Sequence, residues 1–227
     1  MESVVSPRQL ALALNHAESF ARDDFVAGSS NAAALALIDR WPDWPDRVMV
    51  LVGPEGSGKS HLASIWAAAA GARFLAARSL AQADLPAAFA TGALVLEDLS
   101  PALTDERALF HLLNLAREEH AFALLTARTP PAGWPVTIRD LGSRLRVLPV
   151  VTVAPPDDGL LRALIVKLAA DRQIFMDELL VNYLANRVER TFTGAQAAVA
   201  RLDQEAMRQQ RPVTRALAAE LFRDGLT

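Results

Sequence analysis

The residues with the clearest chemistry lie at positions 53–60, which read Gly-Pro-Glu-Gly-Ser-Gly-Lys-Ser and fit the pattern G-x-x-x-x-G-K-[ST] without a mismatch. Glycines allow such a loop to fold tightly, so that several backbone N–H groups converge on phosphate oxygens. A helix that begins at Lys59 directs the positive end of its dipole toward the same oxygens. We therefore expect a phosphate-binding loop in which Lys59 contacts the outer phosphates and Ser60 gives a hydroxyl to Mg²⁺. The expected nucleotide contacts in this loop are Gly53, Pro54, Glu55, Gly56, Ser57, Gly58, Lys59 and Ser60.

Two acidic residues, Glu97 and Asp98, directly follow the apolar run 94–96. A phosphate-binding loop works with a carboxylate at the end of a neighbouring strand, which holds Mg²⁺ directly or through water. The usual order is Asp at the metal position and then Glu, so here the metal ligand, Glu97, is longer by one methylene and the catalytic base, Asp98, is shorter. Hydrolysis depends on accurate placement of the attacking water. We expect ATP or ADP binding with slow unaided turnover; the alternative is an ordinary strand end with solvated acids.

The elements that must position these residues alternate between strand and helix. The run 48–52 is continuously apolar and ends at Gly53, as is typical of a strand buried on both faces. A helix is predicted over 59–70, closed by Gly71, and another over 104–119, with Thr104 as its N-cap. This alternation predicts an α/β fold with a parallel sheet and crossover helices. The other predicted strands are 72–76, 93–96, 122–126 and 147–153.

A second, all-helical part is predicted after the double proline at 155–156, because strand signals stop there. The predicted organisation is therefore an N-terminal segment (1–22), an α/β nucleotide-binding domain (23–155) and a small all-α lid domain (156–227). Helical spacing runs over 157–171, 177–188, 193–209 and 214–221.

Composition excludes several classes of function. The chain has 227 residues, no cysteine and a net charge of −3, from 23 basic and 26 acidic residues. Thiolate catalysis and cysteine-based zinc sites are therefore excluded, and the balance argues against strong sequence-independent binding to DNA or an anionic membrane. The longest charge-free run, 25–38, is shorter than a membrane-spanning helix requires, so we expect a cytoplasmic protein. Of the two lysines, Lys59 lies in the phosphate-binding loop and Lys167 is expected on a solvated helix face.

Several motifs together resemble those of the AAA+ proteins of the DnaA clade and, within it, the short DnaA homologues of the Hda type. The run 24–31 is similar to the family's N-terminal box, and 53–61 to its nucleotide loop with a trailing His-Leu. The runs 124–131 and 140–145 resemble its sensor 1 and its arginine-finger box. The resemblance implies a P-loop AAA+ fold, an adenine pocket, and a trans-acting arginine that neutralises charge on a neighbour's phosphoryl group. The residues that this match assigns are Phe25, Val26, Asn31 and His61 at the nucleotide, Thr126 near the γ-phosphate, and Arg144 as the finger.

Two departures from the family pattern bear on activity. Where the family carries a sensor 2 arginine on a lid helix, this sequence has Thr193, with Arg190 one turn earlier. No basic recognition helix like that of the DnaA DNA-binding domain follows the predicted lid before Thr227. We therefore expect weak ATPase activity at most and no strong direct binding to DNA.

The N-terminal segment carries a short motif of alternating leucines. Residues 9–14, Gln-Leu-Ala-Leu-Ala-Leu, are similar to the peptide with which Hda-type proteins bind the bacterial sliding clamp. An extended peptide of this kind places alternate leucines in an apolar pocket. The alternative is an amphipathic helix that packs on the body of the protein. The partner-binding residues of this prediction are Gln9, Leu10, Leu12 and Leu14.

The leading hypothesis is a regulatory AAA+ protein that binds the clamp and promotes hydrolysis of DnaA-bound ATP, with ATP or ADP and Mg²⁺ as cofactors. Its implied partners are DnaA and the sliding clamp, and AAA+ contacts allow a homodimer or a head-to-tail assembly. A second hypothesis is a self-sufficient, initiator-type ATPase acting at DNA. A third is a small-molecule kinase, which normally has an arginine-rich lid inserted within its sheet rather than helices after it.

Overall fold

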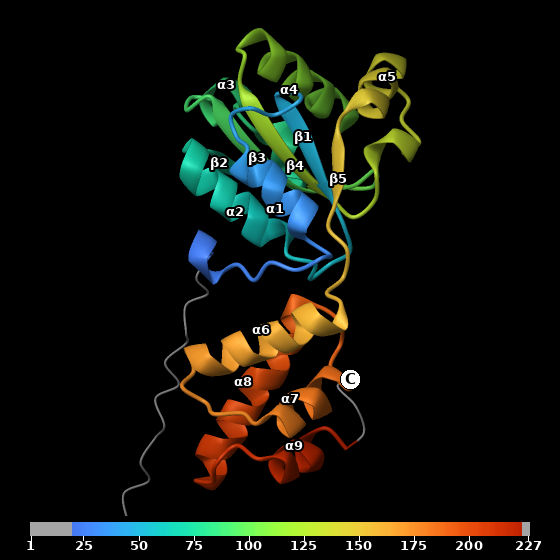
Figure 1. The fold of residues 1–227 in the computed structure, drawn as a ribbon. Helices are drawn as coiled ribbons and strands as arrows, with labels where there is room; N and C mark the ends of the chain where they lie inside the picture. The colour runs from blue at the N-terminus through green and yellow to red at the C-terminus, as the bar shows by residue number, and fades with distance from the viewer. Residues whose placement is uncertain (1–19, 224–227) are drawn as a thin grey trace, which may run out of the picture.

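A parallel β-sheet forms the centre of the first part of the chain (Figure 1). In the computed structural model, which describes residues 20–223, the five strands have the order β2-β3-β4-β1-β5, and all neighbours are parallel. Parallel neighbours require crossover connections, which the helices between them provide. The predicted α/β fold is confirmed. The strands are β1 (Val48–Val52), β2 (Arg73–Ala76), β3 (Ala93–Leu99), β4 (Phe122–Ala127) and β5 (Val150–Thr152).

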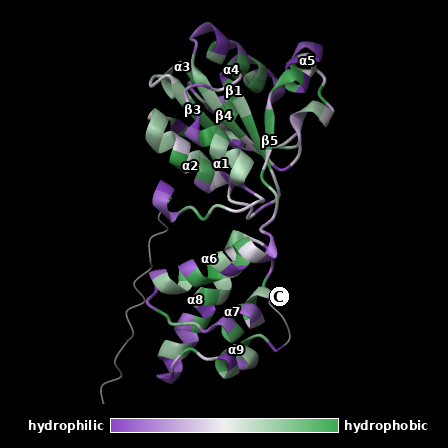
Figure 2. Ribbon diagram, in the orientation of Figure 1, coloured by the Kyte–Doolittle hydropathy of each residue, from purple (hydrophilic) through white to green (hydrophobic). Residues whose placement is uncertain are grey.

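Helices cover both faces of this sheet, so β1 is buried along its whole length. Val48, Val50 and Val52 face one apolar cluster, which includes α4, whereas Met49 and Leu51 face another, which includes α1 and α2. Successive side chains of a strand point to opposite faces, which explains the continuous apolar run. Figure 2 shows the apolar residues gathered in the strands and the helices against them. The helical elements here are η1 (Arg22–Asp24), α1 (Ala32–Asp39), α2 (Lys59–Ala70), η2 (Ala77–Gln82), α3 (Leu85–Ala88), α4 (Glu106–Glu118), η3 (Pro131–Gly133) and α5 (Arg139–Val147).

Within the described residues, four helices follow the sheet and pack around a separate apolar core. Leu161, Leu184, Val199 and Leu202 are completely buried in it. We call this part the lid. Each lid helix begins with a side chain that caps a backbone N–H: Asp157, Asp177, Thr191 and Thr214. The lid helices are α6 (Asp158–Asp171), α7 (Glu178–Ala185), α8 (Phe192–Gln209) and α9 (Arg215–Leu221).

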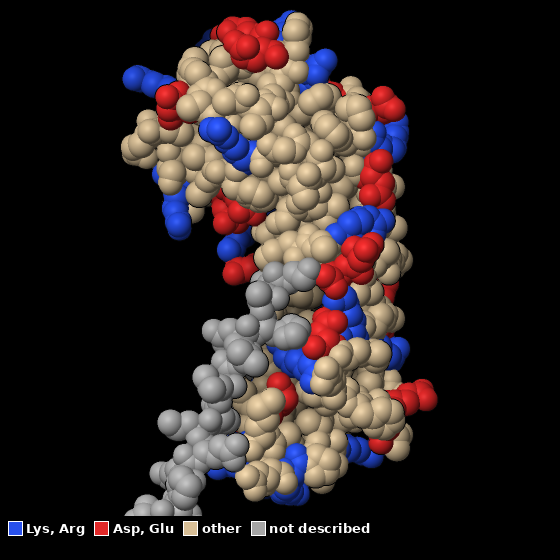
Figure 3. Space-filling view, turned by 90° about the vertical axis from the view of Figure 1, so that its left-hand side faces the viewer, with Lys and Arg blue, Asp and Glu red and all other residues tan. Residues whose placement is uncertain are grey.

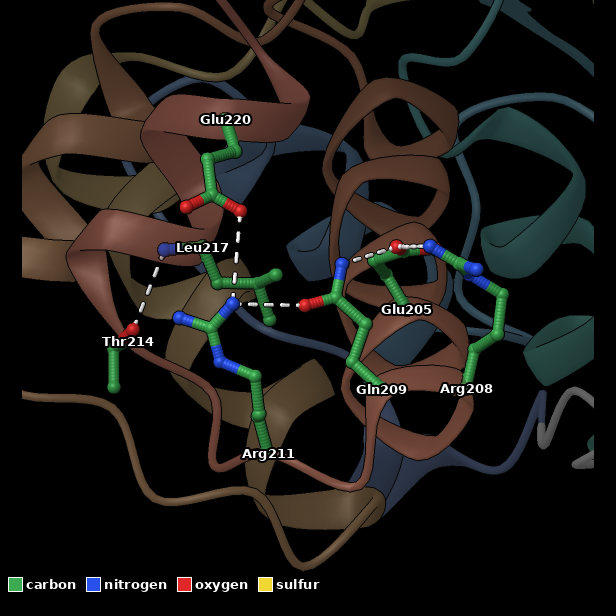
Figure 4. A network of polar contacts seen from close by, with 7 residues as sticks. All are labelled: Glu205, Arg208, Gln209, Arg211, Thr214, Leu217 and Glu220. Carbon is green, nitrogen blue, oxygen red and sulfur yellow. Dashed lines mark hydrogen bonds and ion pairs between the residues drawn. The ribbon is translucent and has the colours of Figure 1, made fainter.

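A surface polar network joins the end of α8 to α9 (Figure 4). Glu205 accepts hydrogen bonds from Arg208 and Gln209, which lower the pKa of Glu205 to about 2. Arg211 donates to the Gln209 side chain at 2.9 Å and lies 3.8 Å from Glu220 of α9. The network lies at the surface of the lid, with Arg208 exposed and Glu205 and Gln209 half-buried.

Several predicted boundaries differ from those of the structure. The fourth strand of the chain order, β4, ends one residue later than predicted, and β3 continues to Leu99 past a shift in its register with β4. The last strand begins only at Val150, because Val147 still belongs to α5. The N-cap of α4 is Asp105, not Thr104, since the hydroxyl of Thr104 instead accepts from the Ser100 N–H.

None of the helices in the described range is long and apolar enough to cross a membrane.

The Asp105 cap leads to a stability prediction. Its carboxylate accepts from the Ala108 N–H at 2.8 Å, so we expect Asp105→Ala to lower the free energy of unfolding by about 1 kcal/mol. Asp105→Asn keeps a capping oxygen and is the matched control, with an expected loss of only a few tenths of a kcal/mol. Urea denaturation measures both. An unchanged Asp105→Ala variant would show that α4 does not depend on this cap.

Candidate nucleotide-binding site

The phosphate-binding loop lies at the carboxyl end of β1, between β4 and β5. The Gly53 N–H donates to the Ala127 carbonyl of β4 at 3.1 Å, which anchors the start of the loop to the sheet. A Cβ on Gly53 would lie 2.2 Å from the Val153 carbonyl oxygen, so no side chain fits there. The first position of the motif therefore requires glycine, because the backbone that follows β5 passes too close to leave room for a Cβ.

The lid packs directly on the same loop. The Phe192 N–H, at the start of α8, donates to the Gly56 carbonyl at 2.9 Å. Gly56 has φ +68°, and a Cβ there would lie 2.6 Å from the Thr193 hydroxyl and 2.7 Å from the Thr191 Cβ. Both the backbone conformation and the lack of space therefore require glycine. One loop thus contacts the sheet through Gly53 and the lid through Gly56.

Lys59 is held inside the loop on backbone oxygens. Its ammonium donates to the Gly53 carbonyl at 2.9 Å and to the Pro54 carbonyl at 2.7 Å, and the residue is only 8% exposed. Burial lowers the pKa of Lys59; the Asp98 charge opposes this shift and Arg128 adds to it. A phosphate oxygen could replace these carbonyls with a stronger, charge-assisted partner.

A second buried group also fits a phosphate ligand. The Ser57 hydroxyl has no hydrogen-bond partner among the described residues, although Ser57 is only 7% exposed. A buried hydroxyl without a partner is costly, and a phosphate oxygen in the loop would satisfy it. With the amino end of α2 directed at the loop, these residues fit a nucleotide's phosphate chain.

A cavity of about 250 Å³ continues from the loop between the sheet domain and the lid. Its apolar walls include Val26 from the segment before α1 and Leu160 and Leu164 from α6, which suit a flat, largely apolar base. The sequence did not point to these two leucines, because their helical spacing only marks them as buried. The lining residues are Phe20, Asp24, Phe25, Val26, Asn31, Gly56, Ser57, Gly58, Lys59, Ser60, His61, Pro156, Leu160, Leu164, Phe192, Thr193 and Gln196.

The predicted nucleotide residues are thus mostly brought together. All those from Gly56 to His61 line the cavity, as do Phe25, Val26 and Asn31, whereas Gly53, Pro54 and Glu55 do not.

Asn31 and His61 act as supports of the cavity wall. Asn31 is 6% exposed; its Oδ1 accepts from the Gly28 N–H at 2.8 Å, and its Nδ2 donates to the Val26 carbonyl at 3.0 Å. These two bonds fix the bend of the segment that faces the base. The His61 ring lies edge-to-face with Phe25, with centroids 5.1 Å apart.

The lid carries Thr193, rather than an arginine, to the phosphate side of the cavity. Thr193 lines the cavity beside Gly56. Arg190 instead pairs with Asp158 at 2.7 Å and is absent from the described lining. The structure therefore places Thr193, and not Arg190, at the position where a lid cation would face the phosphates.

Lys167 ties the lid to the edge of the cavity, so the prediction of a solvated helix face is wrong. Its ammonium lies 2.9 Å from Asp24 and 2.7 Å from Asp171. Burial alone would lower the pKa of Lys167, but hydrogen bonds to Asp171 and Asp24 outweigh it and raise the pKa. A second link joins the same parts, because the Ser29 hydroxyl donates to the Asp157 carboxylate.

The acidic pair lies near the loop but outside the cavity lining. Glu97 is half-buried, and Asp98 is exposed with φ +58° at the register shift of β3. The buried Thr126 hydroxyl accepts from the Asp98 N–H at 3.0 Å, which holds this irregular strand end in place. Thr126 thus contacts the acidic segment and does not line the cavity.

The donors suit a metal ion that is bound mainly through phosphates. No cluster of three or more His, Asp or Glu residues within residues 20–223 could hold a metal by itself. Mg²⁺ usually keeps several waters and uses one or two protein oxygens together with substrate phosphates. The exposed Ser60, in the first turn of α2, and Glu97 are the residues that would hold it.

Arg144 lies away from the nucleotide cavity of its own chain. It belongs to α5, and its guanidinium carbon lies 5.2 Å from the centroid of the Phe110 ring. It lines a separate groove of about 580 Å³ with Arg47 and Val48, which stand at the start of β1, whereas the phosphate-binding loop follows the end of that strand. Arg144 is therefore not among the described residues that line the nucleotide cavity of its own chain.

Helix α4 positions the helix that carries Arg144. The Glu106 carboxylate accepts from the Thr137 N–H at 2.9 Å and from the Ile138 N–H at 3.0 Å, so it satisfies backbone donors at the start of α5. These bonds, the Thr137 backbone bond foremost, lower the pKa of Glu106. Phe110, one turn later on α4, is the residue under Arg144. Sequence reasoning missed Glu106, because nothing in its local sequence marks it.

The predicted clamp-binding residues, Gln9, Leu10, Leu12 and Leu14, lie outside the described residues.

Comparisons with known proteins agree with the fold. No model of a known protein family matches the sequence. The chain is 24% identical over 237 residues to the chromosomal replication initiator protein DnaA of Thermomicrobium roseum, with 89% of this chain and 49% of that protein covered. It thus spans about half the length of the curated relative that it matches.

Among solved structures, domain III of the Thermotoga maritima replication initiation protein DnaA superimposes with a TM-score of 0.74 at 18% identity, covering 92% of this chain and 97% of that one. AMPPCP-bound DnaA from Aquifex aeolicus gives 0.68 at 15% identity, over 83% and 68% of the chains. The Thermotoga maritima RuvB Holliday junction branch migration motor also gives 0.68, at 18% identity, over 90% and 72%. The chain has a DnaA-like AAA+ fold.

The Asn31 contacts give a prediction for the cavity wall. Asn31→Ala removes the partners of the partly buried Gly28 N–H and Val26 carbonyl, so we expect the free energy of unfolding to fall by about 1–3 kcal/mol and ADP affinity to fall with it. Chemical denaturation and calorimetric titration measure the two effects. Asn186→Ala, at an exposed position after α7, is the matched control and should change stability by less than about 0.5 kcal/mol. Equal behaviour of the two variants would contradict the supporting role of Asn31.

Proposed function

We propose that this protein is an AAA+ regulator of chromosome replication initiation of the Hda type. It binds an adenine nucleotide in its own cavity and promotes hydrolysis of ATP bound to DnaA through Arg144. The observation that carries the proposal is the separation of Arg144 from its own nucleotide cavity, together with the likeness to DnaA.

Adenine nucleotide binding is supported by the site itself. The loop offers Lys59, the unpartnered Ser57 hydroxyl and the amino end of α2 to phosphates, and the cavity offers apolar walls to a base. A DnaA with the same fold has been solved with AMPPCP. ATP or ADP is the proposed ligand, with Mg²⁺ held between its phosphates, Ser60 and Glu97.

Weak turnover by the protein alone is supported by the geometry around the phosphates. The residue at the position of the catalytic base is Asp98, which is exposed and whose side chain is shorter than that of the usual Glu. The lid presents Thr193 to the cavity instead of a cationic side chain. A transition state that gathers charge on the phosphoryl oxygens is stabilised less by a hydroxyl than by a guanidinium. The nucleotide would then act mainly by stabilising a conformation of this chain, and its hydrolysis would contribute little.

Action in trans is supported by the placement of Arg144. Glu106 fixes the start of α5, and the Phe110 ring lies under the Arg144 guanidinium, so the position of this side chain is defined by its neighbours. Arg144 has no ion-pair partner among the described residues. In a head-to-tail AAA+ contact, such an arginine faces the nucleotide of the next subunit. DnaA is the proposed neighbouring subunit, and a second copy of this chain is the alternative neighbour.

Contact with DNA is proposed to be indirect, through the sliding clamp. On the face drawn in Figure 3, Lys and Arg side chains are interspersed with Asp and Glu and form no broad basic surface. The proposed clamp ligand is the peptide with Gln9, Leu10, Leu12 and Leu14. Docking on the DNA-loaded clamp would bring Arg144 to DnaA, lowering the active initiator and preventing re-initiation.

A self-sufficient, initiator-type ATPase is the second candidate. The likeness to RuvB, described as a branch migration motor, is as close by TM-score as that to the AMPPCP-bound DnaA. The fold by itself therefore accommodates both functions.

Arg144→Ala tests the proposed function. In a mixture of DnaA, ATP, clamp and DNA, we expect the variant to lose most of the stimulation of DnaA turnover, because an arginine finger contributes about 10³-fold or more to the rate. Arg146→Ala, an exposed arginine on the same helix, is the matched control and should stimulate normally.

The same assay has two contrary outcomes. Equal stimulation by both variants would remove Arg144 from the finger role. Rapid ATP turnover by this protein without DnaA would favour the initiator-type ATPase.

A pull-down with purified sliding clamp tests the N-terminal peptide. We expect wild-type protein to bind and a Gln9→Ala, Leu10→Ala double variant to lose binding, since the peptide loses its rim hydrogen bond and an apolar anchor. Changing Arg78 to Ala, at an exposed position in η2, is the control. Retention by the double variant would mean that the clamp, if bound, is contacted elsewhere.

A further inference from the structure

Arg128 stands at the carboxyl end of the sheet, beside the phosphate-binding loop. It follows Ala127, which pairs with Val52 at the end of β1 and accepts the Gly53 N–H. Its guanidinium lies 2.7 Å from the Glu55 carboxylate within the loop. Both side chains are largely exposed, at 65% and 75%, so the pair stands at the open mouth of the loop.

The strand order puts Arg128 where the end of a triphosphate would lie. Because β4 runs between β1 and β3, its carboxyl end separates the phosphate-binding loop from Glu97 and Asp98. A nucleotide held in such a loop directs its outer phosphate and metal ion toward these acids. Arg128, the residue that directly follows β4 on this edge, would therefore lie next to the outer phosphate of a bound nucleotide.

Both cations of this region are satisfied by oxygens of the loop itself. Lys59 donates to the Gly53 and Pro54 carbonyls, and Arg128 pairs with Glu55. An exposed arginine–carboxylate pair contributes little stability, about 0–1 kcal/mol. A guanidinium matches phosphate as well as carboxylate, so a phosphate dianion at the mouth of the loop can displace Glu55 as its partner.

The charge balance around Lys59 favours a second cation. The pKa of Lys59 is lowered first by burial; the charges of Asp98, Glu55 and Glu97 raise it, and the charge of Arg128 lowers it further. Three of these are acidic and would oppose a triphosphate. The lid supplies Thr193 at the cavity, and its Arg190 is paired with Asp158.

We propose that Arg128 binds the outermost phosphate of a nucleoside triphosphate within its own chain, exchanging Glu55 for that phosphate, and so makes the site prefer ATP to ADP. The inference rests on the nucleotide binding proposed above and extends it by naming the residue that distinguishes the two nucleotides. It differs from the role of Arg144, which acts on another chain.

A purely structural role for the pair makes different predictions. If Arg128 only held the loop closed through Glu55, loss of either partner would weaken ADP and ATP alike. If Arg128 binds the outer phosphate, the two partners behave oppositely, because removing the Glu55 charge frees the guanidinium.

Calorimetric titration of the full chain with ADP and with AMPPCP, both with Mg²⁺, separates these roles. For Arg128→Ala we expect AMPPCP to bind about tenfold more weakly, whereas the Kd for ADP changes by less than about twofold. For Glu55→Gln we expect AMPPCP affinity to rise, by up to about fivefold. Arg208→Ala, which breaks an arginine–glutamate ion pair in the lid network of Figure 4, is the matched control and should bind both nucleotides like the wild type.

Two results would overturn the proposal. Equal weakening of ADP and AMPPCP in Arg128→Ala, or a loss of AMPPCP binding in Glu55→Gln that parallels Arg128→Ala, would show that the pair only holds the loop closed and that Arg128 does not distinguish the two nucleotides. Binding of neither nucleotide by the wild-type chain would overturn the nucleotide site together with this inference. Circular dichroism of each variant verifies that it is folded.

Discussion

The arrangement of this molecule depends on two positions in the phosphate-binding loop that have no room for a side chain. At Gly53 the carbonyl of Val153 occupies the space, and at Gly56 the start of α8 does. The same loop is therefore packed against the sheet on one side and the lid on the other. A ligand that changes the conformation of this loop would therefore displace atoms in both the sheet domain and the lid, because closely packed groups transmit small displacements.

The three cationic side chains proposed to act on nucleotides lie in two separate places. Lys59 and Arg128 lie at the loop, whereas Arg144 lies on α5, supported by Glu106 and Phe110. The first group lies beside the chain's own phosphate-binding loop, whereas Arg144 lines a different groove. In the proposed regulator, the internal site would sense which nucleotide is bound, and the external arginine would act on the partner.

The lid is joined to the sheet domain by polar links as well as by the loop. Lys167 bridges Asp171 of its own helix and Asp24 before α1, and Ser29 donates to Asp157. These links lie beside the cavity, since Asp24 is part of its lining. Lys167 therefore connects the lid to the edge of the cavity.

The sequence by itself determined the features that depend on neighbours along the chain. The motif at 53–60, the apolar strand before it and the helix after it all follow from local spacing, and they predicted both the loop and the α/β class. Local patterns could not indicate which helix face another segment covers, so Lys167 was wrongly expected to be solvated. Nor could they indicate that Glu106 supports α5, that Leu160 and Leu164 line the cavity, or that Arg128 meets Glu55. Those contacts join residues far apart in sequence, and only the packing of the sheet against the lid brings them together.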